Sequence, residues 1–264
     1  MGDSDSGEVI IRADSRNAIL FVTSRGKISN LILKQSGDGE WNCVDFSQGF
    51  LEIEHCDISS DSATCISIKG NAYSKIIHNK IHNGKGSGIC VCENGQGLIE
   101  SNDIYNNGSA NVEIYGNGNP IVKSNCIFSG KGAGIYVHGD GKGVIEDNEI
   151  YENISACVGI CENGNPIIKH NKIYNGKNAG IYIYNNGQGV IEDNDIYCNE
   201  NSGIAIYSGG NAKVIRNKIH DGKSNGIALD NSKGVIEDND IFQNNSCGIR
   251  ISNGANPMII RNNP

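Results

Sequence analysis

Isoleucine and valine recur along the chain at a fixed interval, and polar residues alternate with them. One phrase, usually Gly-Ile-x-Ile or Gly-Ile-x-Val, returns every 23 residues apart from one interval of 22. Its first apolar residues are Ile66, Ile89, Val112, Ile135, Val158, Ile181, Ile204, Ile227 and Ile249. Alternating apolar positions are typical of strands with one buried face, and the Gly/Asn clusters between them are typical of turns. The pattern therefore predicts short strands separated by tight turns.

A second phrase, Asn-x-Ile-aromatic, keeps step with the first. Its asparagines are Asn79, Asn102, Asn125, Asn148, Asn171, Asn194, Asn217 and Asn239. The last of these intervals is 22, as is the interval between Ile227 and Ile249, so one residue is expected to be missing between Asp230 and Lys233. Fixed self-similarity at this period predicts a solenoid in which each unit stacks on its neighbours.

The residue types decide which solenoid is expected. Leucine is too scarce for a leucine-rich repeat, whereas β-branched residues pack well in parallel strands whose inner face is buried. We therefore predict an all-β fold, a right-handed parallel β-helix of about ten coils of 23 residues. Residues 1–55 are less regular and are expected to form a divergent N-terminal coil or cap, and residues 56–264 one continuous array. Because the repeat stops abruptly at Pro264, we expect a longer chain or a partner to cover the last coil.

Stacking turns each repeated position into a column of like residues about 4.8 Å apart. The asparagines are expected to form a ladder of amide hydrogen bonds, since a catalytic residue would be needed once rather than eight times. In the column that follows them, Lys172 is expected to lie within reach of both Glu149 and Asp195. The isoleucines predicted to form a buried spine include Ile150, Ile173 and Ile196. The lysines that recur at every second coil and predict a two-coil unit are Lys85, Lys131, Lys177 and Lys223.

The composition argues against several classes of function. A net charge of −8 and a pI of about 5.2 disfavour nucleic acid as a partner. No apolar run has the length of a membrane span, and the opening MGDSDSGEV lacks the apolar stretch of a signal peptide. The ten cysteines lack zinc-site spacing, so we expect free thiols, no metal or cofactor, and an intracellular protein of the cytoplasm or nucleus.

Candidate binding residues lie on the outward side of the Gly-Ile-x-Ile strands. If the first isoleucine points inward, the residues one and three places later point outward. Aromatic side chains on an exposed sheet face are typical anchors of an interface. The predicted binding residues are Glu113, Tyr115, Tyr136, His138, Tyr182, Tyr184, Tyr207 and Asp230. The alternative is that these tyrosines only stack on one another, as expected for the column Tyr105, Phe128, Tyr151, Tyr174, Tyr197 and Phe242.

Catalysis is the competing interpretation of such a chain. Glycoside hydrolysis needs two carboxylates about 5–9.5 Å apart, and a calcium-assisted lyase needs an acidic cluster and a base. Carboxylates such as Asp147 and Glu149 recur in register with the repeat, and the pectinase-type signatures Asn-Thr-Asp, Gly-His-Gly and Arg-Ile-Lys are absent. The sequence therefore favours a non-catalytic recognition or scaffold module, with no catalytic residue, over a lyase, hydrolase or epimerase. A purely structural rod is the third interpretation.

Three runs carry a resemblance to a known family: GKGVIEDNEIYEN (141–153), GNPIIKHNKIYNGKNAGIYIYNNGQGVIEDNDIY (164–197) and NGIALDNSKGVIEDNDIFQN (225–244). They resemble the pectin-lyase-like β-helix repeats of the F-box-only ubiquitin-ligase adaptors, and more broadly those of carbohydrate-binding proteins, sugar hydrolases and periplasmic copper-processing proteins. The resemblance covers about residues 56–264. In the adaptor family, the resemblance implies that the β-helix recognises a protein substrate. A repetitive aromatic face would suit an extended peptide or a glycan. Only recognition is carried over, because no F-box pattern precedes the repeats and fold does not fix function.

Overall fold

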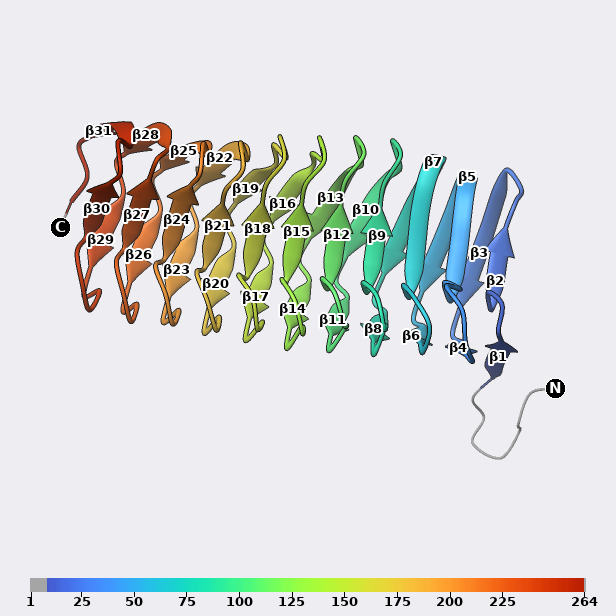
Figure 1. The fold of residues 1–264 in the computed structure, drawn as a ribbon. Coiled ribbons are helices and arrows are strands. Elements are labelled where there is room, and N and C mark those ends of the chain that lie inside the picture. The colour runs from blue at the N-terminus through green and yellow to red at the C-terminus, as the bar shows by residue number, and fades with distance from the viewer. Residues whose placement is uncertain (1–8, 264) are drawn as a thin grey trace.

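The computed structural model describes residues 9–263, and these residues form strands joined by short turns, with no helix among them. Figure 1 shows the chain wound coil upon coil into an elongated rod, with the first coil (blue) and the last (red) at opposite ends. A typical coil contributes one strand to each of three rows, and successive coils pair in parallel. The all-β parallel solenoid predicted from the repeat is therefore confirmed.

The strands fall into three rows according to the part of the repeat that forms them. The first row, which contains the Asn-x-Ile-aromatic phrase, is β1 (Ile10–Asp14), β4 (Ile32–Ser36), β6 (Asp57–Ser60), β8 (Lys80–His82), β11 (Asp103–Tyr105), β14 (Cys126–Phe128), β17 (Glu149–Tyr151), β20 (Lys172–Tyr174), β23 (Asp195–Tyr197), β26 (Lys218–His220) and β29 (Asp240–Phe242). The second row, which contains the Gly-Ile-x-Ile phrase, is β2 (Ile19–Phe21), β9 (Ile89–Val91), β12 (Val112–Ile114), β15 (Ile135–Val137), β18 (Val158–Ile160), β21 (Ile181–Ile183), β24 (Ile204–Tyr207), β27 (Ile227–Asp230) and β30 (Ile249–Ser252). The third row is β3 (Arg25–Ser29), β10 (Gln96–Glu100), β13 (Asn119–Lys123), β16 (Val144–Glu146), β19 (Ile167–Lys169), β22 (Gln188–Glu192), β25 (Asn211–Ile215), β28 (Lys233–Glu237) and β31 (Asn256–Ile260), and the long strands β5 (Val44–Glu54) and β7 (Ile66–Ile77) belong to both the second and the third rows.

The irregular N-terminal segment is built on the same plan as the repeats. Ile10 in β1 pairs with Ile32 in β4, and Ile32 pairs with Asp57 in β6, all in parallel register. The first row therefore contains eleven strands, and the chain forms about eleven coils rather than ten. Because β5 and β7 run from the second row into the third, these two rows form one 20-stranded sheet.

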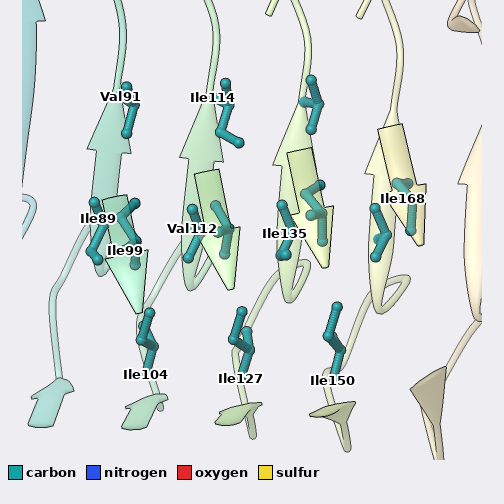
Figure 2. Packing of buried hydrophobic residues seen from close by; sticks show 14 of the residues in the cluster. Ile89, Val91, Ile99, Ile104, Val112, Ile114, Ile127, Ile135, Ile150 and Ile168 are labelled. Atoms are coloured by element: carbon teal, nitrogen blue, oxygen red, sulfur yellow. The ribbon is translucent and has the colours of Figure 1, made fainter. Parts of the chain in front are cut away.

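The core is a set of apolar columns that run along the inside of the rod (Figure 2). The predicted spine is confirmed, because successive isoleucines pair in register and are fully buried: Ile150, Ile173 and Ile196. Burying one isoleucine stabilises a fold by roughly 1.5–3 kcal/mol. At the last coil the core columns lack a neighbour on one side, so Ile251 is 48% exposed and Ile259 is 43% exposed.

The predicted asparagine ladder is present and links every repeated asparagine to the next. The Asn171 amide nitrogen donates to Asn194 Oδ1 and to the carbonyls of Ile145 and Lys169, each at 2.9 Å. Its Oδ1 accepts from the backbone and side-chain nitrogens of Asn148, both at 2.9 Å. A buried amide with both ends satisfied holds one coil to the next. The asparagines are thus structural.

A second ladder, which the sequence analysis missed, explains the two-coil unit. In the turn before the second row, glycine alternates with asparagine: Gly84, Asn107, Gly130, Asn153, Gly176, Asn199, Gly222 and Asn244. The Gly176 amide donates to Asn199 Oδ1 at 3.0 Å, and the same bond joins each glycine to the next asparagine. A Cβ atom at Gly176 would lie 2.8 Å from Cys157 Sγ and 3.0 Å from Asn199 Oδ1. Asparagine therefore fits only in alternate coils.

Two finer predictions have different outcomes. The missing residue does lie between Asp230 and Lys233, because Tyr207 pairs with Asp230 while Asn211 pairs with Lys233. The charge prediction is correct only in part.

Lys172 pairs in register with both Glu149 and Asp195, but it contacts only Glu149, at 3.3 Å. Asp195 instead accepts a hydrogen bond from His220 at 2.9 Å. Register places the backbone positions side by side, whereas a competing neighbour decides which carboxylate each cation reaches.

Candidate ligand-binding face

The predicted binding residues do lie together on the outer face of the second row. Glu113, Tyr136 and Tyr182 occupy the middle position of β12, β15 and β21, which places them in one column with Gly159 between the two tyrosines. Tyr115, His138, Tyr184, Tyr207 and Asp230 form the neighbouring column at the ends of the same row of strands. All eight side chains are half-buried. We call this surface the tyrosine face.

The two columns of the tyrosine face differ from the other columns of the rod, because the residue type in each changes at almost every coil. Its first column reads Cys90, Glu113, Tyr136, Gly159, Tyr182, Ala205, Ala228 and Arg250. Its second column reads Cys92, Tyr115, His138, Cys161, Tyr184, Tyr207, Asp230 and Ser252. The inward residues of these strands therefore follow the repeat, whereas the outward residues do not.

The outer aromatic column of the first row provides a contrast. Eight rings stack there without a break, with centroids 4.9–5.3 Å apart and planes within 15° of parallel: His82, Tyr105, Phe128, Tyr151, Tyr174, Tyr197, His220 and Phe242. The predicted stack is therefore present, and it also includes His82 and His220. Neighbouring rings cover each other's faces, so this column is satisfied within the chain.

His138 is the centre of the tyrosine face. Its imidazole stacks between Tyr115, at a centroid distance of 5.0 Å, and Tyr136, at 4.5 Å. Its Nε2 lies 3.1 Å from Glu113 Oε1, and its Nδ1 lies 3.8 Å from Glu162 Oε2. Two aromatic rings and two carboxylates therefore hold one imidazole.

Glu113 is an ionised carboxylate that takes part in a network across three coils. Burial alone would raise the pKa of Glu113, but hydrogen bonds from His138 and Ser87 outweigh burial and lower this pKa. The Ser87 hydroxyl donates to Glu113 Oε2 at 2.5 Å. A charge-assisted bond of this length fixes the carboxylate in position.

Tyrosine side chains form the other half of the face. The Tyr136 hydroxyl lies 3.0 Å from both the Tyr184 hydroxyl and Cys161 Sγ. Burial and these two hydrogen bonds raise the pKa of Tyr136, so the hydroxyl is neutral. Tyr182 stacks on Tyr184 at 4.6 Å and meets the Tyr207 ring edge-on, at 5.8 Å and 88°.

Asp230 and a pair of cysteines mark the two ends of the face. Asp230 accepts hydrogen bonds from Ser252 and Asn253, so its carboxylate has partners within the chain. We therefore place Asp230 at the edge of the tyrosine face. At the other end, a hydrogen bond with Cys90 and another with Tyr115 lower the pKa of the Cys92 thiol to about 7 against the effect of burial. The sequence analysis missed Cys90 and Cys92, although counting back one period from Glu113 and Tyr115 finds both.

The charges on the face restrict its chemistry. Glu113 and Glu162 lie on opposite sides of His138, so the imidazole occupies the space that a sugar and a water would need in a glycosidase. The nearest lysine of the second column is Lys69, three coils from His138, and it pairs with Asp45 at 3.2 Å.

In residues 9–263 no three His, Cys, Asp or Glu side chains are placed to hold a metal. Within the same range no helix has the length and apolar character needed to cross a membrane. All ten cysteines are free thiols, as predicted.

The family model described as "right handed beta helix region" matches residues 17–160 and 124–264 of this chain. These two stretches overlap and include all the coils that carry the tyrosine face. The chain belongs to the right-handed β-helix family. No curated protein is similar enough in sequence to be matched.

Solved structures with a similar fold include two epimerases and a lyase, whose titles name alginate, mannuronan and pectate. The periplasmic alginate epimerase AlgG gives a TM-score of 0.69 at 14% identity, over 99% of this chain and 79% of that chain. The A-module of mannuronan C-5 epimerase AlgE4 from Azotobacter vinelandii gives 0.58 at 11% identity, over 96% and 89% of the two chains. Pectate lyase Pel9A gives 0.50 at 10% identity, over 94% and 69%. At these identities the likeness shows the fold alone.

Proposed function

We propose that this β-helix is a recognition module that binds an extended, uncharged glycan along the tyrosine face. One observation carries the proposal: the outer columns of the second row depart from an otherwise regular repeat. Chemically different side chains there form hydrogen bonds across coils, as between Glu113 and His138 and between Tyr136 and Tyr184. Departures from a local rule are expected at functional sites, because stability alone would favour a regular column.

The shape and chemistry of the face support a glycan as the ligand. The face lies along a sheet that extends over many coils, and tyrosine offers both an apolar ring and a hydroxyl to a sugar. The AlgG, AlgE4 and Pel9A structures, whose titles name enzymes that act on polysaccharides, support the same ligand class.

The charge of the face favours an uncharged glycan over a uronate polymer. Glu113 is ionised and Glu162 is exposed beside His138. Lys69 is three coils away and neutralised by Asp45. Like charges repel, so a polyanion such as alginate would bind more weakly than a neutral chain of the same length.

The same arrangement favours binding without catalysis. A lyase or an epimerase acting on uronates must neutralise the sugar carboxylate, and the two tyrosine columns place no cation next to His138. Tyr136 has a raised pKa and is a donor rather than a base. A glycosidase would need a carboxylic acid that stays protonated, whereas the pKa of Glu113 is lowered.

The test is titration calorimetry with hexamers of β-1,4-linked glucose, mannose, xylose and N-acetylglucosamine, beside hexamers of mannuronate and galacturonate. We expect a neutral hexamer to bind, Tyr182→Ala to weaken binding at least tenfold, and chelation with EDTA to leave binding unchanged. Tyr151→Ala, in the regular stack of the first row, is the matched control and should bind like wild type. New reducing or unsaturated ends would overturn the non-catalytic assignment, and tighter binding of the uronates would overturn the charge argument.

A protein partner is the second candidate, and it is the function that the adaptor resemblance implies. The third row carries an outward apolar column over five coils: Leu98, Ile121, Val144, Ile167 and Val190. Ile121 and Ile167 are each 41% exposed. The charges beside this column, such as Lys169 and Glu146 at 3.0 Å, are already paired with one another. An exposed apolar column flanked by charged residues that are paired with one another is typical of a protein interface.

The protein-partner candidate predicts that Ile121→Lys abolishes capture of a specific protein from a cytoplasmic or nuclear extract, while Tyr182→Ala does not. Lys213→Ala, in the same column but outside the apolar run, is the control. Capture that survives Ile121→Lys would count against this candidate, as would capture that Lys213→Ala weakens equally. The ubiquitin-pathway role and the intracellular location are part of this second proposal.

A further inference from the structure

We infer that the outer face of the first row carries a separate anion-binding pocket, which takes a phosphate monoester. The pocket lies at the N-terminal end of the rod, over β1, β4, β6 and β8, whereas the tyrosine face lies on the second row (Figure 1). Its volume is about 450 Å³, which is within the roughly 300–1,000 Å³ typical of small-molecule sites. This site does not depend on the glycan-binding function proposed above.

Two cations stack on each other in this pocket, contrary to the charge pattern of the rest of the rod. Arg12 in β1 pairs in register with Lys34 in β4. Wherever else two charged residues pair between strands in residues 9–263, their signs are opposite, as for Glu149 and Lys172. Neither Arg12 nor Lys34 has an ion pair among these residues. Like charges on neighbouring strands destabilise a sheet, and an anion bound between them would remove the repulsion.

A change of residue type in one column creates the space for a ligand. The outward column of the first row reads Arg12, Lys34, Ser59 and His82, and from His82 it continues as the ring stack. Ser59 has a small side chain where the following coils have rings, and its hydroxyl has no hydrogen-bond partner in the described part of the chain. Two cations therefore lie on one side of the pocket and an imidazole on the other, with a hydroxyl between them.

A second histidine of the same column shows which contact His82 lacks. His220 and His82 each contact a carboxylate of the preceding coil through Nε2, at 2.9 and 3.1 Å. The Nδ1 atom of His220 also lies 2.7 Å from the Asp221 carboxylate. At His82 the next residue is Asn83, and Nδ1 is buried without a hydrogen-bond partner among residues 9–263. The same imidazole position thus has two anions at His220 and only one at His82.

The charges and donors of the pocket favour a phosphate monoester over a carboxylate. A phosphate monoester carries about −1.5 to −2 charges at pH 7 and has three strong acceptor oxygens. It can therefore neutralise both Arg12 and Lys34 while it accepts a hydrogen bond from the Ser59 hydroxyl. Asp61 is the one carboxylate among the lining residues, and it is exposed and forms no ion pair with either cation. Asp61 therefore weakens anion binding without neutralising the pocket.

The first test is titration calorimetry with glucose 6-phosphate in a phosphate-free buffer at constant ionic strength. We expect a dissociation constant below about 1 mM, and glucuronate, which has a carboxylate in place of the phosphate, should bind at least tenfold more weakly. Lys34→Gln should weaken glucose 6-phosphate binding at least tenfold. Lys213→Gln removes a cation outside the pocket and should change binding less than twofold. Asp61→Asn should tighten binding at least twofold.

The second test supplies the anion that the pocket lacks. Asn83→Asp places a carboxylate directly after His82, as Asp221 follows His220, and should weaken glucose 6-phosphate binding at least tenfold by competing with it. Asn175 occupies the same turn position and has the same φ of 54° as Asn83, but it lies outside the pocket. Asn175→Asp is therefore the matched control and should bind like wild type.

The melting temperature separates a binding site from a structural pair of residues. Because Arg12 and Lys34 repel each other in the empty protein, Lys34→Gln should raise the melting temperature without ligand by about 1–2 °C. The same variant should lose the stabilisation that saturating glucose 6-phosphate gives wild type. A lower melting temperature of Lys34→Gln without ligand would show that Lys34 stabilises the fold, and it would overturn the inference.

Other results would also overturn the site. They are a dissociation constant above about 1 mM, glucuronate binding within tenfold of glucose 6-phosphate, and normal binding by both Lys34→Gln and Asn83→Asp. Binding of the neutral hexamer at the tyrosine face should be unchanged in both variants. Failure of the anion pocket therefore leaves the proposed function standing, and a protein that binds no glycan can still bind glucose 6-phosphate.

Discussion

Replacing one central rung of the asparagine ladder tests whether the ladder holds the coils together. We predict that Asn171→Ala destabilises the protein by about 3 kcal/mol. The substitution removes five hydrogen bonds of a side chain that is 1% exposed. The backbone N–H of Asn148 then has no acceptor, which alone costs about 1–3 kcal/mol, and each lost bond adds part of the usual ~1 kcal/mol.

Two other positions set the scale for this prediction. Asn262 forms four of these bonds, bonds to no further asparagine within residues 9–263 and is only partly buried, so Asn262→Ala should cost about 1 kcal/mol. Asn165 is exposed and has no side-chain hydrogen bond within the described residues, so Asn165→Ala should change stability by less than about 0.5 kcal/mol. Asn171→Asp should be worse than alanine at neutral pH, because a carboxylate oxygen would face three acceptors.

The assay is urea unfolding followed by far-ultraviolet circular dichroism, with each variant compared at the same pH. Lowering the pH should restore part of the stability of Asn171→Asp, because the protonated acid can again donate one hydrogen bond. An Asn171→Ala variant as stable as Asn165→Ala would refute the reasoning. So would equal losses at Asn171 and Asn262, since the central rung would then contribute nothing beyond a terminal one.

Three further predictions follow from the core, the charge column and the tyrosine face. Ile173→Asp places a carboxylate in the buried spine and should cost several kcal/mol, so an unchanged melting temperature would contradict the core assignment. Lys172→Glu breaks an exposed pair with Glu149 and should cost only about 0.5 kcal/mol, with a larger effect at low than at high salt. The folded-state pKa of Glu113 is lowered, so its contribution to stability is present above the ordinary carboxyl pKa and lost as pH falls through the lowered value. The loss of unfolding free energy at acid pH should therefore be smaller in Glu113→Gln than in wild type. If the loss is the same in both, a group other than Glu113 causes it.

The sequence by itself determined the fold, the register and the core. A period of 23 residues fixes which backbone positions stack, and stacking buries the same inward position in every coil, as at Ile150, Ile173 and Ile196. The same arithmetic located the missing residue between Asp230 and Lys233. The 23-residue period did not give the register of residues 10–54, because these coils differ from it in length. Their strands still pair in parallel, since backbone hydrogen bonds do not require the repeated side chains.

Only the tertiary structure decided what the outward side chains do. Periodicity placed Tyr136, His138 and Tyr184 on one face, but an outward side chain has several directions open to it, and its neighbours in space select one. Asp195 thus bonds to His220 rather than Lys172. Tyr136 crosses the coil of Gly159 to reach a hydroxyl 48 residues away in the sequence. Inward positions are dictated by close packing between coils, whereas outward positions depend on contacts that a one-dimensional repeat does not record.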